Sequence, residues 1–194
     1  MIQTCIPHTG TIEANLVDWM ITNGIKPFME RAYSVCRGRN NLINRFLTDS
    51  KAEWLFYLDS DMWPATDKLF EFVESQPNDV QVLLVPGITN KLRWNFSIND
   101  SGELIKLKDY NPKGLYNLKP IKTFGGSGIF LRRSLVEKLP KNIWRDPNNE
   151  VTGEDILFSY TLTQTYKVPA YLIDGSALHH QKGGFDLHSL VGNE

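Results

Sequence analysis

Short apolar runs alternate with amphipathic segments over the first 86 residues, and this alternation constrains the fold most strongly. The runs typical of buried or half-buried strands lie at residues 2–7, 26–33, 54–58 and 79–86. The segments with apolar side chains at helical spacing lie between them, at residues 11–23, 38–50 and 65–75. Strands that alternate with helices predict an α/β fold, in which helices cover both faces of a sheet.

The second half of the chain has a different pattern. Residues 93–107 resemble a β-hairpin with a turn around Asn99 to Gly102. Further strands are expected within residues 121–134 and 170–180, with a helix over residues 153–166 between them. Residues 1–194 are therefore expected to form a single Rossmann-like α/β domain, with a mixed, mostly parallel central sheet flanked by helices and a small antiparallel hairpin. Two threonines, Thr11 and Thr66, are candidate caps of the first and third helices.

Composition limits the classes of partner. A net charge of −1 over 194 residues creates no general attraction for nucleic acid or anionic lipid, so a charged ligand must be bound locally. Apolar runs stay shorter than a membrane span requires. Cys5 and Cys36 form neither a zinc pattern nor a disulfide framework, which favours buried, reduced thiols. We expect a cytoplasmic protein with no membrane span and no nucleic-acid binding.

The stretch "EWLFYLDSDMWP" is an apolar strand that ends in two aspartates. Because side chains alternate along a strand, Asp59 and Asp61 are expected on the same side, roughly 6–7 Å apart. They follow the carboxyl end of a strand, where open α/β sheets bind ligands. Two adjacent carboxylates repel each other, and neither has a cationic neighbour in the sequence. Oxygen ligands of this kind suit Mg²⁺ or Mn²⁺, so the pattern indicates a divalent cation site.

Five motifs along the chain resemble the GT-A class of nucleotide-sugar glycosyltransferases, in particular the small family-2-like enzymes and those of phages and viruses. In order, they are "RGRNNL", "YLDSDMWP", "GGSGIFLRRS", "GEDILF" and "HHQKGG". The resemblance covers nearly the whole chain. It implies a metal-dependent transfer of a sugar from a UDP- or GDP-type nucleotide-diphosphate sugar to a hydroxyl acceptor, such as a glycan.

The resemblance also implies roles for individual residues. Asp61 would bind the metal, and Asp59 would contact the metal or the ribose. The remaining candidates for donor and nucleotide binding are Pro7, His8, Thr9, Arg39, Asn40 and Ser60. Arginine suits this role because its guanidinium can bind phosphate through two hydrogen bonds.

The loop "FGGSG" would lie beside the donor sugar and the acceptor, which makes Gly126, Ser127 and Gly128 candidates. Glycines permit close backbone approach and positive φ, so a tight turn between strands explains the same residues. Trp94 is a further candidate because aromatic faces stack on sugars, although packing within the hairpin is the alternative.

In inverting members of this class, the aspartate of a Glu-Asp pair acts as general base, which here makes Asp155 the base with Glu154 beside it. Acidic residues also stabilise the first turn of any helix. A late histidine often completes the metal site, with His180 favoured over His179. Neighbouring residues on a strand face opposite ways, so only one of the two histidines can serve.

Three other functions compete with glycosyl transfer. A D-x-D phosphatase also places two aspartates after a strand, but Trp63 stands where it normally has Thr or Val. A sugar nucleotidyltransferase carries a glycine-rich, arginine-bearing loop after its first strand, whereas this chain has "PHTGTIEAN". A non-catalytic carbohydrate- or nucleotide-binding protein would bind the same ligands without turnover.

Overall fold

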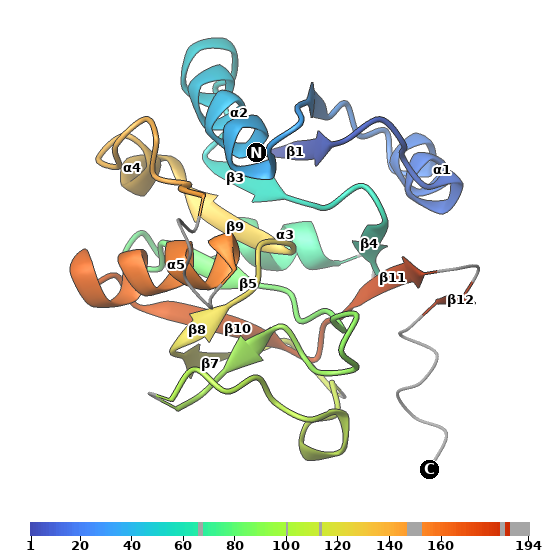
Figure 1. Cartoon of the computed structure of the whole chain (residues 1–194), viewed down its shortest axis with the longest axis vertical. Coiled ribbons are helices and arrows are strands. Elements are labelled where there is room, and N and C mark those ends of the chain that lie inside the picture. Colours follow the sequence, from blue (N-terminus) through green and yellow to red (C-terminus); the bar gives the residue numbers. More distant parts are fainter. Residues whose placement is uncertain (66–67, 100, 113, 147–152, 183–184, 187–194) are drawn as a thin grey trace.

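The computed structural model describes residues 1–65, 68–99, 101–112, 114–146, 153–182 and 185–186 (Figure 1). Its strands are β1 (Ile2–His8), β2 (Phe28–Arg31), β3 (Trp54–Tyr57), β4 (Met62–Pro64), β5 (Val82–Leu84), β6 (Phe96–Ser97), β7 (Asn117–Ile121), β8 (Thr123–Phe124), β9 (Ile129–Arg132), β10 (Ala170–Asp174), β11 (Leu178–Lys182) and β12 (Phe185–Asp186). Its α-helices are α1 (Ala14–Thr22), α2 (Val35–Asp49), α3 (Leu69–Glu74), α4 (Arg133–Val136) and α5 (Glu154–Tyr160). A 3₁₀ turn, η1 (Leu107–Asp109), and a π-helical turn, η2 (Thr161–Thr165), complete the set.

Within the described residues, a seven-stranded sheet with the order β2-β1-β3-β9-β5-β10-β7 forms the centre of the protein. Strands β2, β1 and β3 are parallel, and β5 and β10 are parallel. Strand β9 runs antiparallel between β3 and β5, and β7 runs antiparallel to β10. Five strands thus point the same way, which confirms the predicted α/β class and the mixed, mostly parallel sheet.

Two hydrophobic cores lie on opposite faces of this sheet (Figure 1). Leu55 and Tyr57 of β3 belong to the core that includes side chains of α2, α4 and α5. Trp54 and Phe56 belong to the other core, with side chains of α1 and α3. All four residues are buried because both faces of the strand are covered, and this explains why the strand has no polar alternation.

The helices begin at different residues from those predicted. Helix α2 begins at Val35, because Ser34 caps it by accepting a hydrogen bond from the backbone N–H of Arg37 at 3.4 Å. Helix α1 begins at Ala14, so Thr11 is not its cap. The other predicted cap, Thr66, lies outside the described residues. No helix in the described part of the chain combines the length and the apolar character needed to cross a membrane.

Of two predictions for the second half of the chain, one needs correction and the other is confirmed. The expected strand over residues 170–180 is two strands, because Gly175 turns the chain with a φ of 84° between β10 and β11. Residues 93–107 do fold back, with an antiparallel bridge between Arg93 and Lys106. The Trp94 N–H donates to the Ile105 carbonyl at 2.9 Å and the Ile105 N–H donates to the Phe96 carbonyl at 3.1 Å, so the predicted hairpin is present. Strand β6 also pairs with β8, where Phe96 lies opposite Phe124. Strand β11 pairs with β4 and β12 in a separate small sheet.

Candidate functional site

A pocket of about 230 Å³ opens at the carboxyl ends of β1 and β3, where the sequence predicted ligand binding. These ends lie together because β1 and β3 are neighbouring parallel strands. The predicted residues that line the pocket are Pro7, His8, Thr9, Arg39, Asp59, Ser60, Asp61 and Glu154. The structure thus brings together side chains that the sequence distributes over 148 positions, from residue 7 to residue 154.

Arg39 is the buried centre of the site, with a side chain that is 3% exposed. Its guanidinium Nη2 contacts Asp59 Oδ1 at 3.1 Å, and its Nη1 contacts Glu154 Oε1 at 3.3 Å. The guanidinium also lies 4.4 Å from the ring centre of Trp144, within the range of a cation–π contact. Burial alone would lower the pKa of Arg39, but Asp59 and Glu154 raise it above its ordinary value, so the side chain remains charged.

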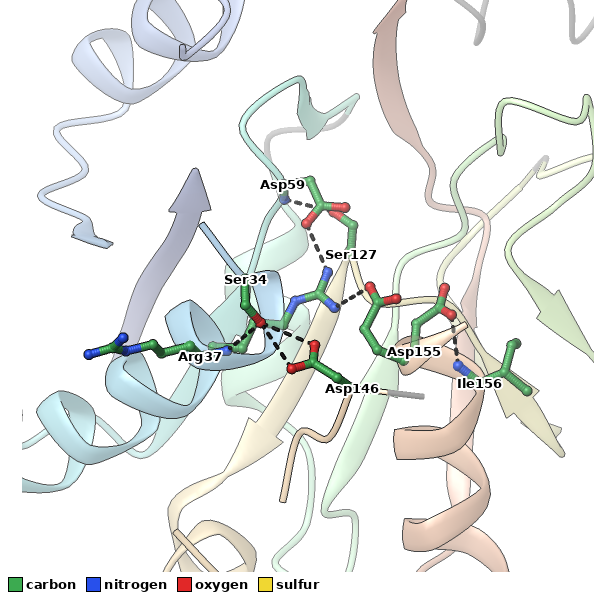
Figure 2. A network of polar contacts seen from close by, with 9 residues as sticks. Ser34, Arg37, Asp59, Ser127, Asp146, Asp155 and Ile156 are labelled. Carbon is green, nitrogen blue, oxygen red and sulfur yellow. Dashed lines mark hydrogen bonds and ion pairs between the residues drawn. The ribbon is translucent and has the colours of Figure 1, made fainter. Parts of the chain in front are cut away.

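Asp59 therefore has a cationic partner that its sequence neighbours did not reveal. Its backbone N–H donates to Ser127 Oγ at 2.9 Å (Figure 2). The carboxylate is held by Arg39 of α2, and the backbone is held by the loop before β9. Asp59 is thus fixed from two sides, and a direct contact with a metal would compete with Arg39.

The "GGSG" loop needs glycines because it packs closely against Arg39 and neighbouring backbone. A Cβ on Gly126 would overlap the guanidinium of Arg39. Gly128 has a φ of 78°, and a Cβ there would lie 2.5 Å from the carbonyl oxygen of Val85. The tight-turn interpretation therefore accounts for both glycines, and none of Gly126, Ser127 and Gly128 lines the pocket.

Asp61 also has a partner, since His180 Nε2 lies 3.4 Å from Asp61 Oδ2. The other ring nitrogen of His180, Nδ1, lies 2.5 Å from the carbonyl oxygen of Ile88. Burial would lower the pKa of His180, but the contacts with Asp61 and with the Ile88 carbonyl raise it overall. The side chain of Asp61 remains 34% exposed, so it stays accessible to a ligand.

The two adjacent histidines have different surroundings, as alternation along a strand requires. His180 is buried and faces Asp61, whereas His179 is half-buried and stacks on Trp63 with ring centres 5.2 Å apart. Of the two, His180 is therefore the one that lies at the site. Whether it binds a metal stays a prediction.

The N-terminus of α5 places the Glu-Asp pair beside the pocket, but the two carboxylates differ. Glu154 lines the pocket and contacts Arg39. Asp155 is half-buried and does not line it, and its Oδ1 accepts a hydrogen bond from the backbone N–H of Ile156 at 2.8 Å (Figure 2). The residue that the structure brings into the pocket is thus Glu154.

Two further candidates lie away from the pocket. Asn40 Nδ2 donates to the Trp144 carbonyl at 2.8 Å, and its Oδ1 accepts from the Trp144 backbone N–H at 3.1 Å. This amide therefore holds the tryptophan on which Arg39 stacks. Trp94 is fully buried, and its Nε1 donates to the carbonyl of Tyr110, so it packs as a core residue.

The pocket also has walls that the sequence reasoning missed. Ser34, Val35 and Gly38, from the first turns of α2, line it, so the positive end of that helix faces the ligand space. Ser34 is further tied to Asp146 by a hydrogen bond of 3.1 Å (Figure 2). Ser34 is a typical N-cap residue that closely follows a strand, so the sequence did contain a sign that α2 begins beside the pocket.

The sequence matches no protein-family model, and no curated protein matches it at a significant level. Solved structures do share the fold. A197 from STIV is 22% identical with a TM-score of 0.71, over 94% of this chain and 86% of that one. A glycosyltransferase involved in the glycosylation of the major capsid of PBCV-1 is 15% identical with a TM-score of 0.51, over 89% and 82%.

S. aureus TarS 1-349, solved in complex with UDP-GlcNAc, is 11% identical with a TM-score of 0.52. That match covers 97% of this chain and 60% of the TarS fragment. These likenesses show the α/β fold alone, and it is the GT-A-like fold that the glycosyltransferase of PBCV-1 capsid glycosylation and the TarS fragment share.

Proposed function

We propose that this protein is a glycosyltransferase that moves a sugar from a nucleotide-diphosphate sugar, of UDP or GDP type, to a hydroxyl acceptor such as a glycan. The observation that carries the proposal is the pocket at the ends of β1 and β3, in which Asp59 and Asp61 lie opposite the N-terminus of α2. A helix N-terminus favours the phosphates of a nucleotide, and the aspartates offer oxygen ligands for a cation.

The charge of the pocket supports a divalent cofactor, Mn²⁺ or Mg²⁺. Its lining includes the carboxylates of Asp59, Asp61 and Glu154 and the single guanidinium of Arg39. A diphosphate would add further negative charge to this pocket, and the like charges would repel unless a cation lay between them. Asp61 is the carboxylate of this lining that would hold such a cation, and the cation would offset the charge of a bound diphosphate.

The donor set fits such a cation in part. Among the described residues, no group of three or more His, Cys, Asp or Glu side chains is arranged to hold a metal ion by itself. Mg²⁺ is commonly bound by only one or two carboxylates together with substrate phosphates and water. Asp61 and His180 are the residues that would hold it, and the contact of His180 Nδ1 with the Ile88 carbonyl orients the ring as second-shell partners of metal-bound histidines do.

Other residues of the pocket would hold its loop in place and bind the donor. Arg39 keeps Asp59 and Glu154 in place around the pocket, so the loop after β3 is fixed before the donor binds. His8 and Thr9, at the end of β1, line the pocket, and we propose that they contact the ribose and the base. When bound, the cation would offset the negative charge that develops on the leaving diphosphate.

In the transfer itself, the acceptor oxygen forms a bond to the anomeric carbon while the bond from that carbon to the diphosphate oxygen breaks. The acceptor loses its proton, and a carboxylate must accept it as the bond forms. We propose Asp155 for this role in an inverting reaction, with Glu154 beside it at the start of α5. Glu154 is less suited because its carboxylate is already engaged by the guanidinium of Arg39.

The test is nucleotide binding with and without metal. Isothermal titration of UDP and of GDP into the protein should show tighter binding with Mn²⁺ than with a chelator. Asp61→Asn should remove the effect of Mn²⁺ and leave the fold intact, as judged by circular dichroism. Asp79→Asn, an exposed aspartate far from the pocket lining, is the matched control. Equal affinities with metal and with chelator in the parent protein would contradict the proposal.

A further inference from the structure

A second hollow, separate from the nucleotide pocket, is lined by residues of α1, β4 and β11. Figure 1 shows where these three elements lie in the fold. The volume of the hollow is about 500 Å³. The residues that define its chemistry are Asn15, Asp18, Trp19, Trp63, His179 and Gln181. We propose that this hollow, called here the α1 groove, binds a saccharide.

The floor of the groove is aromatic. Trp63 and His179 are paired across β4 and β11, and their rings stack with centres 5.2 Å apart and an interplanar angle of 14°. Both side chains are half-buried, so their rings are part of the accessible surface. A sugar ring presents C–H groups on one face, and these slightly positive groups pack well against the negative face of an aromatic ring. Trp19, from α1, adds a second aromatic side chain to the wall.

The rim of the groove is polar but carries no positive charge from lysine or arginine. Asn15, Asp18 and Gln181 supply amide and carboxylate groups, and neither Lys nor Arg is among the described residues that line it. Hydroxyl groups are bound well by amides and carboxylates, whereas a phosphate or a nucleotide would be repelled by Asp18. The rim therefore favours a neutral, hydroxyl-rich ligand.

The groove is also preformed. Asn15 Nδ2 donates to Gln181 Oε1 at 3.4 Å, which joins α1 to β11 across it. The backbone N–H of Glu13 donates to the carbonyl of Ser60 at 2.9 Å, which anchors the start of α1 to the loop that carries Asp61. A rigid site loses little conformational entropy when a ligand binds.

The groove and the nucleotide pocket share one segment of chain. Asp61 lines the pocket, and Trp63, two residues later, lines the groove. A glycan acceptor that reaches the pocket with its reacting hydroxyl can thus place another sugar unit in the groove. This role as an acceptor subsite rests on the proposed transferase function, whereas saccharide binding itself does not.

The experiment uses the full chain and saturation-transfer NMR. The probes are the methyl glycosides of glucose, galactose, mannose and N-acetylglucosamine, together with the linear oligosaccharides maltotetraose, cellotetraose, mannotetraose and chitotetraose. We expect at least one probe to bind at millimolar concentration. Asp18→Ala should weaken its binding by roughly tenfold, the effect expected for the loss of a hydrogen bond to a charged group. The exposed Asp79→Ala is the matched control and should leave it unchanged.

Trp63→Leu provides a second test of the aromatic floor, with urea unfolding to verify that the variant is folded. Binding by none of the probes, or binding that survives both Asp18→Ala and Trp63→Leu, would overturn the proposal. Titration of UDP and GDP with Mn²⁺ into the same samples separates the two ideas. Saccharide binding without nucleotide binding would support the α1 groove and contradict the transferase function. Nucleotide binding without saccharide binding would support the transferase function and contradict the α1 groove.

Discussion

Replacing Arg39 by methionine tests whether the buried guanidinium holds the site together. Methionine fills a similar volume but leaves the carboxylates of Asp59 and Glu154 without their cation. Breaking a fully buried ion pair by removing one partner costs about 3–5 kcal/mol. Because the two carboxylates are 35% and 31% exposed, they regain part of their hydration, and we expect the lower end of that range, about 3 kcal/mol. In a domain of this size, the melting temperature should fall by about 6–12 °C.

The assay is urea unfolding followed by circular dichroism, with Arg45→Met as the control. Arg45 is 45% exposed and pairs with Asp49 on the surface of the same helix, so its loss should cost less than about 1 kcal/mol. Combining Arg39→Met with Glu154→Gln should cost less than the sum of the two single changes, by about 1 kcal/mol or more. Equal midpoints for Arg39→Met and Arg45→Met, or strict additivity in the cycle, would refute this account of the site.

Three further predictions concern the proposed base, the glycine loop beside Arg39 and a buried carboxylate of β10. Asp155→Asn should retain nucleotide affinity but lower the transfer rate by about 10²–10⁴-fold, with Glu154→Gln as the comparison variant. NMR of the product should show inversion at the anomeric carbon, and retention would remove the need for this base. Gly126→Ala should destabilise the protein by about 1–3 kcal/mol in urea unfolding, because a Cβ there overlaps the buried guanidinium; an unchanged midpoint would show that the loop can shift. Burial would raise the pKa of Asp174, but hydrogen bonds from Lys119 and Tyr110 lower it overall. The ionised carboxylate therefore contributes stability at neutral pH, and this stability is lost as the pH falls below about 4. Asp174→Asn should therefore flatten the pH dependence of the urea midpoint between about pH 5 and pH 2, and an unchanged slope would contradict this.

The sequence predicted where the pocket lies because local patterns determine it. The apolar run before Asp59 favoured a buried strand, which the structure confirms, and ligands bind beyond the ends of such strands in open α/β sheets. The alternation of side chains also separated His179 from His180, and the structure places the expected one beside Asp61.

The partners of the aspartates could not be predicted, since they depend on contacts between distant segments. Arg39 lies 20 residues before Asp59, and Ser127 lies 68 residues after it. No periodicity in the sequence says that the first turns of α2 and the loop before β9 meet at the same point. The direction of β9 was hidden for the same reason, because a run of buried apolar residues is the same in a parallel and an antiparallel strand.

These partners give the two aspartates different roles and, under the proposed function, make nucleotide binding and cation binding depend on each other. Asp59 is neutralised by Arg39 within the protein, whereas Asp61 has only a partly exposed contact with His180 and faces the pocket. With Glu154 on the same lining, carboxylates outnumber the guanidinium. In the proposed transferase, a diphosphate entering alone would therefore meet repulsion, and a divalent cation entering alone would find two ligands among the described side chains, Asp61 and His180. Each ligand therefore improves the site for the other, and by linkage the cation must strengthen nucleotide binding by the same factor as the nucleotide strengthens cation binding. In the proposed transferase, the donor and the cation thus bind as one unit around Asp61, while Asp59 and Arg39 keep the loop that receives them fixed.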